Sequence, residues 1–279
     1  MKWIFAFLLA VLIFGGAALF SYKIFVRPEI IMRAEKKSSA APIVIPDISL
    51  PEFQAAAKLK AEGKLTEARA ALTAVIQRYP GGQHVGAAQD LLGEVNISIL
   101  LSDYPSPDKE EYIVRSGDVL ARVAAKMKST SELIMRTNNL SGTMLRIGQK
   151  LLISRPEFSI LIQRNAKLLY LLNQEHFFKR YHLREEKPPA NAPAKMSTRV
   201  AEIMAWKNGK RIGIGSREFL NSTRWIRLGS AGYVLYSLPD DSHQILDVPP
   251  PATGIGMAAS DVEELSSLVN TRTAVTITQ

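Results

Sequence analysis

An uncharged, largely apolar run at Trp3–Tyr22 is the first pattern along the chain. As a helix rising about 1.5 Å per residue, this run would just cross about 30 Å of hydrocarbon. The small residues at 15–18 could serve a cleaved signal peptide, but the apolar pattern continues past them to Val26, which favours an uncleaved anchor. We therefore predict a single-span membrane anchor at residues 1–27, with residues 3–26 in contact with lipid.

Residues 28–51 contain several prolines among small residues, so we predict an extended linker. Residues 52–103 then show helical periodicity, interrupted at Gly63-Lys64 and at Tyr79-Pro80. The turn and the Tyr-Pro stop resemble a tetratricopeptide repeat, but only one and a half repeats are present. Because such arrays usually need about three units, we expect this helical hairpin to pack on a neighbour or on itself. A plain helical spacer is an equally good interpretation.

The next forty residues read as strand, helix, helix and strand. Tyr112–Val114 is rich in β-formers, and the turn at Ser116–Asp118 offers an N-cap for a first helix. Thr130–Glu132 is suited to starting a second helix, which Asn138-Asn139 ends. A short strand at Lys150–Ile153 completes a βααβ unit, to which we assign residues 110–155.

This unit resembles the LysM domain, a small glycan-binding module. The resemblance rests on the Tyr-x-Val-x-x-Gly-Asp opening from Tyr112, the Asn-Asn-Leu junction at 138–140 and the Gly-Gln-Lys-Leu close from Gly148. Val119 and Ile147 depart from the usual Thr and Pro. The resemblance implies binding of N-acetylglucosamine-containing glycan in a shallow groove between two loops. The residues expected to line it are Gly117, Asp118, Val119, Leu120, Leu145, Arg146, Ile147 and Gly148.

Residues 157–279 are mostly β in pattern, so the whole chain is predicted to be a multidomain α+β protein. Strands are predicted at 159–162, 167–172, 176–182, 200–206, 212–214, 233–238 and 274–277. Asn208-Gly209 is a strong hairpin signal. A helix is predicted at Ser260–Val269, with Ser260 as its N-cap and Glu263 placed for a capping box.

Four pieces of this domain resemble the L,D-transpeptidase family, namely residues 158–183, Ser222–Ile226, Gly232-Tyr233 and Gly254–Met257 before a helix. That family cross-links peptidoglycan stem peptides through a cysteine acyl-enzyme. At the motif positions this chain has Gly254 for the cysteine, Tyr236 for the histidine and Gly256 for the arginine. It contains no cysteine at all, and the chemistry needs a thiolate. The resemblance therefore implies a degenerate domain without catalytic residues.

Other chemistry finds little support in the sequence. Ser237, with His243 a few residues on, is the only nearby pair of nucleophile and base, and an exposed loop histidine is far commoner than a base. No metal-ligand spacing links the four histidines, and no cofactor is predicted. The absence of cysteine also excludes disulfides and thiolate metal sites.

The net charge of +9 is spread along the chain, and no basic helix or aromatic RNA-binding motif argues for nucleic acid as a partner. An anionic cell wall or lipid headgroup is a simpler attraction, and a solvated basic surface without a dedicated partner explains the charge about as well. Basic residues after the span favour a cytoplasmic C-terminal side. Because a wall-glycan module would be useless there, we expect the bacterial inner membrane, with the following domains in the periplasm or wall space.

We thus expect a membrane-anchored protein that binds peptidoglycan glycan strands through a LysM module beside an inactive L,D-transpeptidase-like domain. One alternative is a wall-remodelling enzyme with altered chemistry at Ser237. Another is a scaffold that recruits envelope proteins through the helices of residues 52–103.

Overall fold

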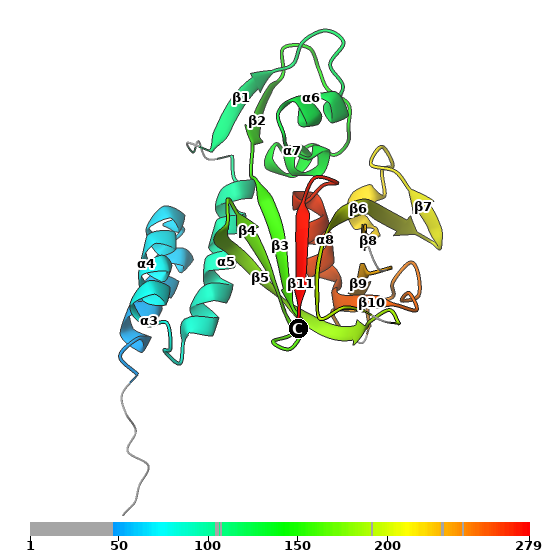
Figure 1. The fold of residues 1–279 in the computed structure, drawn as a ribbon. Helices are drawn as coiled ribbons and strands as arrows, with labels where there is room; N and C mark the ends of the chain where they lie inside the picture. The colour runs from blue at the N-terminus through cyan, green and yellow to red at the C-terminus, as the bar shows by residue number, and fades with distance from the viewer. Residues whose placement is uncertain (1–46, 104–105, 107, 191, 230–231, 242) are drawn as a thin grey trace, which may run out of the picture. The chain divides into compact units, whose positions relative to one another are not determined.

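The computed structural model describes residues 47–279, apart from 104–105, 107, 191, 230–231 and 242 (Figure 1). The predicted anchor and most of the predicted linker lie outside the described residues. Within the described part, no helix is long and apolar enough to span a membrane. Residues Ile48–Gln279 form one compact unit.

Three helices open the described chain: α3 (Leu50–Ala61), α4 (Leu65–Arg78) and α5 (Val85–Leu101). Each places small or aliphatic side chains on a shared core, as the helical periodicity predicted. The buried members of this core are Ala56, Ala68, Leu72, Val75, Ala88, Leu92 and Val95. Gly63, with φ +75°, turns the chain between α3 and α4.

The expected βααβ order is present in the LysM-like segment. Its strands β1 (Lys109–Ile113) and β2 (Lys150–Ser154) pair antiparallel, and α6 (Leu120–Lys126) and α7 (Ser131–Thr137) lie between them. Thr130 caps α7 as predicted, because its hydroxyl accepts the Leu133 amide at 2.9 Å. Asn138 ends α7, and its side-chain amide exchanges hydrogen bonds of 2.7 and 2.8 Å with the backbone of Leu152, so it ties α7 to β2.

Among its described residues, the C-terminal domain has nine strands and one α-helix. The strands are β3 (Phe158–Gln163), β4 (Leu168–Asn173), β5 (His176–Lys187), β6 (Lys195–Lys207), β7 (Lys210–Ile212), β8 (Thr223–Leu228), β9 (Val234–Leu238), β10 (Gly254–Ala258) and β11 (Ala274–Thr278). The helix α8 (Ala259–Leu268) connects β10 to β11. The mostly β prediction for this domain is confirmed.

Eight of these strands close into a barrel. Their order is β11-β3-β4-β5-β10-β9-β8-β6, and β11 also pairs with β6, while β7 extends β6 as a hairpin. β11 runs parallel to β3 and antiparallel to β6, so this last strand closes the ring. Buried residues of the strands and of α8 form one hydrophobic core.

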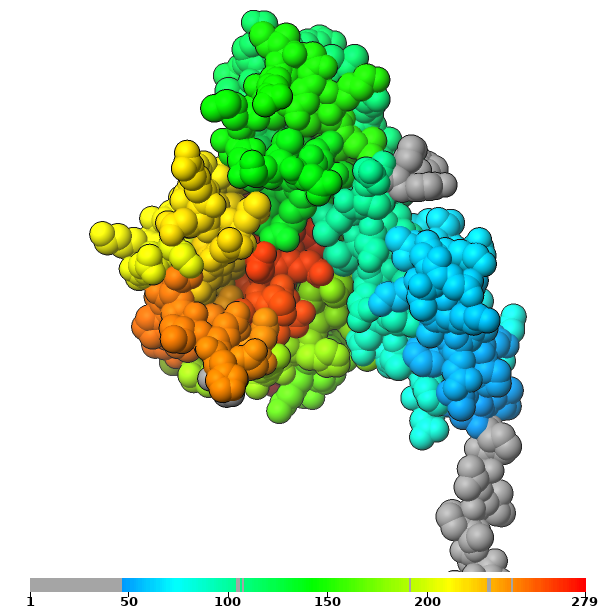
Figure 2. Space-filling model, turned by 180° about the vertical axis from the view of Figure 1, so that it is seen from behind, coloured from blue at the N-terminus to red at the C-terminus, as the bar shows by residue number. Residues whose placement is uncertain are grey.

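Helix α5 packs on the barrel rather than standing apart from it. The Arg180 guanidinium of β5 donates to both carboxylate oxygens of Asp90, at 2.6 and 2.9 Å, and to the Gly86 carbonyl at 2.8 Å. Asn96 donates to the Phe178 carbonyl at 2.7 Å. In Figure 2 the surface of α5 continues that of the barrel, and the green surface of the LysM-like segment borders both. The helical segment therefore packs on a neighbour, as its incomplete repeat suggested.

Two predicted helix caps were wrong. Asp118 does not cap α6, whose N-cap is Val119. The Asp118 carboxylate instead accepts the Arg115 amide and the Tyr112 hydroxyl, both at 2.8 Å, and so closes the preceding turn. Ser260 does not cap α8 either, since the helix begins one residue earlier. Its amide donates to the Asp240 carboxylate at 3.1 Å, so a loop supplies the cap.

Candidate functional site

The β9–β10 pair carries the positions where the sequence motif suggested a degenerate active site. These strands run parallel, with Gly256 opposite Tyr236 and Ile255 opposite Leu235. All five residues of β10 are buried, and Tyr236 is fully buried. The structure therefore brings Gly254, Gly256 and Tyr236 together, but it places them inside the domain rather than on an open cleft.

Gly254 occupies a position that only glycine can fill. Its φ of +140° is unfavourable for residues with a side chain. A Cβ atom added there would also lie 2.2 Å from the Val234 carbonyl oxygen, well inside van der Waals contact. A cysteine in the same backbone conformation would clash with β9. The backbone at this position therefore excludes the cysteine that the family motif would place there.

The Tyr236 ring covers both glycines. Cβ atoms built at Gly254 and Gly256 would lie 3.1 Å from its ring carbons. The Tyr236 hydroxyl donates to the Glu185 carboxylate at 2.8 Å. Burial, together with this bond, raises the pKa of Tyr236 well above its usual range, so the phenol stays protonated at neutral pH. The ring fills the space beside both glycines.

Ser237 and His243 do not form a nucleophile–base pair. Ser237 is 1% exposed, and its hydroxyl donates to the Arg224 carbonyl at 2.9 Å. His243 is exposed on the loop after β9, where its backbone amide donates to Asp241. No hydrogen bond joins the two side chains in the described part of the chain. Ser237 is thus held as a buried hydroxyl on the carbonyl of a neighbouring strand.

The two loops predicted to bind glycan lie next to each other in the LysM-like segment. The Gly148 amide donates to the Val114 carbonyl at 2.8 Å, and the Val114 amide donates to Gln149 at 2.9 Å. Gly117 and Gly148 each have a φ of +83°, which turns both loops tightly. These bonds hold the loop before α6 against the loop before β2.

The eight predicted groove residues do not have equal access to a ligand. Leu120 is 1% exposed in the segment's core, a correction to its predicted place, so only its backbone could contact a sugar. The Asp118 carboxylate is used in its own turn, and Leu145 packs against the core. Val119 and Ile147 are 52% and 74% exposed, and Arg146 is exposed beside Ile147.

A hollow of about 670 Å³ lies along the second loop and includes the predicted residues Arg146, Ile147 and Gly148. Met144 also lines it and is 89% exposed, which was not predicted. The signal that could have identified Met144 is an apolar residue in a turn-rich loop, three positions before Ile147. This loop offers exposed apolar side chains to a ligand.

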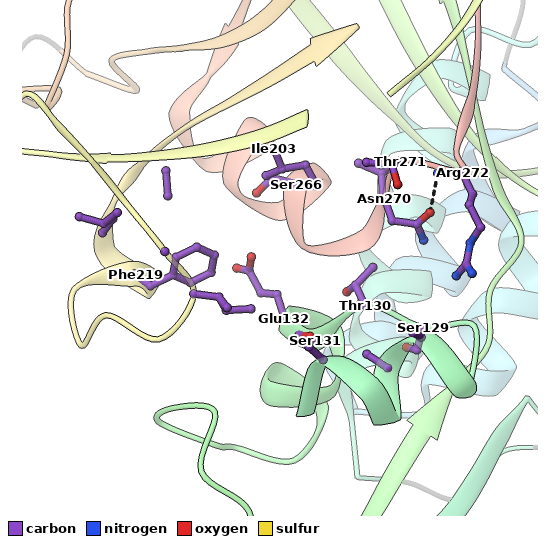
Figure 3. Close-up of a pocket in the computed structure, with 18 residues that line it drawn as sticks. Ser129, Thr130, Ser131, Glu132, Ile203, Phe219, Ser266, Asn270, Thr271 and Arg272 are labelled. Carbon is purple, nitrogen blue, oxygen red and sulfur yellow. Dashed lines mark hydrogen bonds between the residues drawn. The ribbon is translucent and has the colours of Figure 1, made fainter. Parts of the chain in front are cut away.

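A second hollow of about 490 Å³ lies between the LysM-like segment and the barrel (Figure 3). Glu132 and Phe219 lie toward one end of it, and Asn270 and Arg272 toward the other. It was not predicted, because its walls come from residues far apart in the sequence. Among all the described residues, no three His, Asp or Glu side chains are grouped to hold a metal ion.

Comparison with known families identifies one segment of the chain. Residues 112–154 match the family model described as LysM domain. The expectation drawn from the motifs between Tyr112 and Ile153 is therefore confirmed, and we refer to this segment as the LysM domain. No curated protein matches the chain.

Solved structures similar to this chain include L,D-transpeptidases at low similarity. One from Mycobacterium smegmatis is 8% identical with a TM-score of 0.31, and the match covers 48% of this chain and 65% of that one. L,D-transpeptidase 1 from Mycobacterium tuberculosis is 7% identical with a TM-score of 0.30, covering 47% and 67%. L,D-transpeptidase 3 from the same organism, with a faropenem-derived adduct, is 10% identical with a TM-score of 0.31, covering 61% and 90%. This chain spans just under two thirds of the first of these proteins, and no residue role is transferred from them.

Proposed function

We propose that this chain is a non-catalytic peptidoglycan-binding protein of the bacterial cell envelope. Residues 3–26 would anchor it in the inner membrane, and the domains after the linker would lie in the periplasm or wall space. The LysM domain would bind N-acetylglucosamine-containing glycan strands. The observation that carries this proposal is the LysM domain at residues 112–154, whose exposed loop residues are free to contact a ligand.

Apolar side chains on the two loops suit the flat faces of sugar rings. Val119 and Ile147 expose more than half of their surfaces, although exposing such side chains to water is unfavourable. Backbone groups beside Gly148 would pair with the acetamido groups of the glycan. Binding by one module would be weak, and tethering to the membrane would raise its effective concentration at the wall.

The barrel would contribute no acyl transfer. Gly254 cannot carry a thiol in its present conformation, and the Tyr236 ring occupies the space beside it. The alternative of an enzyme that uses Ser237 finds no support, because that hydroxyl is buried and bonded to the Arg224 carbonyl. We expect both the wild type and Ser237→Ala to be inert in a muropeptide assay. Turnover by the wild type that Ser237→Ala abolished would refute the non-catalytic part of the proposal.

Co-sedimentation with purified peptidoglycan tests the binding part. The double variant Val119→Ser, Ile147→Ser removes two exposed apolar contacts without touching the domain core. If each side chain contributes about 1 kcal/mol or more when covered by a sugar, affinity should fall at least about tenfold. The matched control is Ile245→Ser, which removes an apolar side chain that is 94% exposed on the barrel. We expect the control to bind like the wild type.

Equal binding by the double variant and the wild type would reject these loops as the glycan site. If binding were instead lost only when residues 52–103 are deleted, and not in the loop variants, the chain would act as a scaffold through its helices.

A further inference from the structure

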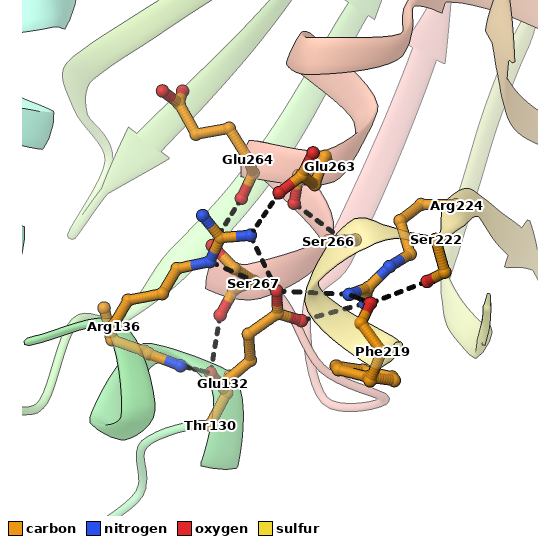
Figure 4. A network of polar contacts seen from close by, with 11 residues as sticks. Thr130, Glu132, Arg136, Phe219, Ser222, Arg224, Glu263, Glu264, Ser266 and Ser267 are labelled. Atoms are coloured by element: carbon orange, nitrogen blue, oxygen red, sulfur yellow. Dashed lines mark hydrogen bonds and ion pairs between the residues drawn. The ribbon is translucent and has the colours of Figure 1, made fainter. Parts of the chain in front are cut away.

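Helix α7 of the LysM domain meets the barrel through a buried ion pair (Figure 4). Arg224 of β8 is fully buried, and its guanidinium donates to the two Glu132 carboxylate oxygens at 3.0 and 3.4 Å. It also donates to the Phe219 carbonyl at 2.5 Å and stacks on the Phe219 ring, with 3.7 Å between the guanidinium carbon and the ring centre. Glu132 is only 4% exposed. The Arg224 charge is thus compensated by a carboxylate from the other domain, and Glu132 is shared between Arg224 and Arg136 of its own helix.

Two further polar residues of α7 and its N-cap surround this pair, Arg136 and Thr130. Arg136 donates to Glu132 at 2.9 Å and to Glu263 of α8 at 2.7 Å, so one guanidinium bridges the two domains. The Thr130 hydroxyl donates to the Ser267 carbonyl at 2.5 Å. Together with Arg224 and Glu132, these residues join α7 to α8 and β8.

The apolar cores of the two domains also interlock. Leu133 of α7 is fully buried, and it belongs to the barrel core together with Ile97 and Leu100 of α5. In the opposite direction, Ile214 and Leu220 of the barrel pack against the LysM core. Neither domain could move away without exposing side chains that belong to the other.

Separation of the LysM domain from the barrel would be energetically unfavourable. A buried ion pair adds little net stability by itself, because both charges are taken out of water. Removing one partner is far more costly, because it leaves the other charge buried and uncompensated. If α7 moved off the barrel, Arg224 would lose both Glu132 oxygens and keep only the Phe219 carbonyl among its protein acceptors. The pair therefore favours one relative orientation of the two domains over all others.

We propose that the barrel is a fixed mount for the LysM domain, with Arg224 as its positioning residue. Arg224 holds α7 in place through Glu132. Asn138 in turn bonds the end of α7 to β2, which follows the second groove loop. The groove therefore faces one direction relative to the barrel. A LysM domain on a flexible tether would instead sample many directions. This role goes beyond glycan binding and does not depend on it.

The absence of native cysteine permits a direct test. Ser141→Cys on the LysM domain and Ser197→Cys on β6 introduce two exposed thiols for spin labels in the full chain. Pulsed dipolar spectroscopy then reports the distribution of distances between the labels. We expect one narrow distribution for the labelled parent. Arg224→Met and Glu132→Gln should each widen it about twofold or more, because the first removes the barrel's charged contact with α7 and the second leaves Arg224 buried without its carboxylate partner.

Arg227→Met is the matched control, since Arg227 lies on the same strand but forms an exposed ion pair with Glu202 at 3.1 Å. It should leave the distribution unchanged. If Arg224→Met fails to fold, Glu132→Gln decides, because this isosteric change lies outside the barrel. A broad distribution in the parent would overturn the proposal, as would unchanged widths in folded variants. The measurement uses no glycan, so a protein that fails to bind peptidoglycan can still confirm or refute the mount.

Discussion

Gly254 and Gly256 allow β10 to lie directly under the Tyr236 ring. Their missing side chains leave space for that ring, and the Tyr236 hydroxyl completes the arrangement by donating to Glu185. The three residues therefore pack as a unit, in which the Tyr236 ring fills the space that side chains at positions 254 and 256 would otherwise take. Replacing any one of them alone disturbs the other two.

Gly254→Ala should destabilise the barrel by about 2–4 kcal/mol, because it combines an unfavourable φ with a clash against the Val234 carbonyl. Chemical denaturation of the full chain measures this change. Gly215→Ala is the control, since a Cβ there meets nothing within 4 Å. Gly254→Cys should be equally destabilised and should not form an acyl-enzyme. A stable Gly254→Cys variant with transpeptidase activity would contradict this account of the site.

At single residues, the motif suggested that Gly254, Gly256 and Tyr236 belong to one site, and the structure places them side by side. The coverage of the glycines by the Tyr236 ring depends on strand register and could not be predicted. The caps assigned to Asp118 and Ser260 were wrong because a competing partner was available, the Arg115 amide in one case and Asp240 in the other. Local sequence contains no information about the distant Asp240.

At the scale of elements, alternation of apolar and polar residues was a good guide. The predicted strand at 274–277 differs from β11 by one residue, and Asn208-Gly209 does connect β6 to β7. The contact of α5 with β5 could not be predicted, because it rests on Arg180 and Asp90, which are 90 residues apart. Amphipathic patterns show that a helix has a buried face, but they do not identify what covers it.

The Asp90–Arg180 pair should make the attachment of α5 sensitive to acid. Burial alone would raise the pKa of Asp90, but the hydrogen bond and charge of Arg180 outweigh it and hold this pKa below its usual range. A lowered folded-state pKa adds stability above the ordinary carboxyl pKa, and this stability is lost as the pH falls through the folded-state value. The relevant window therefore lies below about pH 4.

Asp90→Asn should cost roughly 0.5–1 kcal/mol at pH 7, since the Asp90 side chain is 40% exposed and its ion pair is partly screened. The difference from the wild type should be smaller at pH 2.5, where a larger share of Asp90 is protonated. Urea denaturation at the two pH values measures it. The exposed Asp108→Asn should differ little from the wild type at either pH. A difference for Asp90→Asn that stayed undiminished at the lower pH would exclude the charge as its cause.

At the scale of the whole molecule, α5, the LysM domain and the barrel pack against one another around α7 and α8. Leu133 joins the barrel core to the LysM domain, and α5 reaches the same core through Ile97 and Leu100. The sequence divided this region into three segments, each with its own pattern. The interlocked cores and the Arg224–Glu132 pair are tertiary properties that no local pattern contains.

The closing strand has a consequence for the order of events during synthesis. β11 bonds to β3, and the Thr278 hydroxyl donates to the carbonyl of Ile162, 116 residues earlier. Contacts over such separations form late and slowly. Until Ala274–Thr278 has left the ribosome, β3 and β6 are unpaired edges, which invite association with other chains.

Deletion of residues 274–279 should therefore abolish cooperative unfolding and promote aggregation, whereas removal of Gln279 alone should be neutral. Size-exclusion chromatography and thermal denaturation distinguish the two outcomes, and a monomeric, cooperatively unfolding deletion would argue against closure by β11. The LysM domain precedes Arg224, Glu263 and Ser267 in the chain, so it is synthesised before these barrel residues that hold it. A LysM domain made early thus depends on β11, which is made later, and a chain interrupted before β11 would leave the domain without its mount.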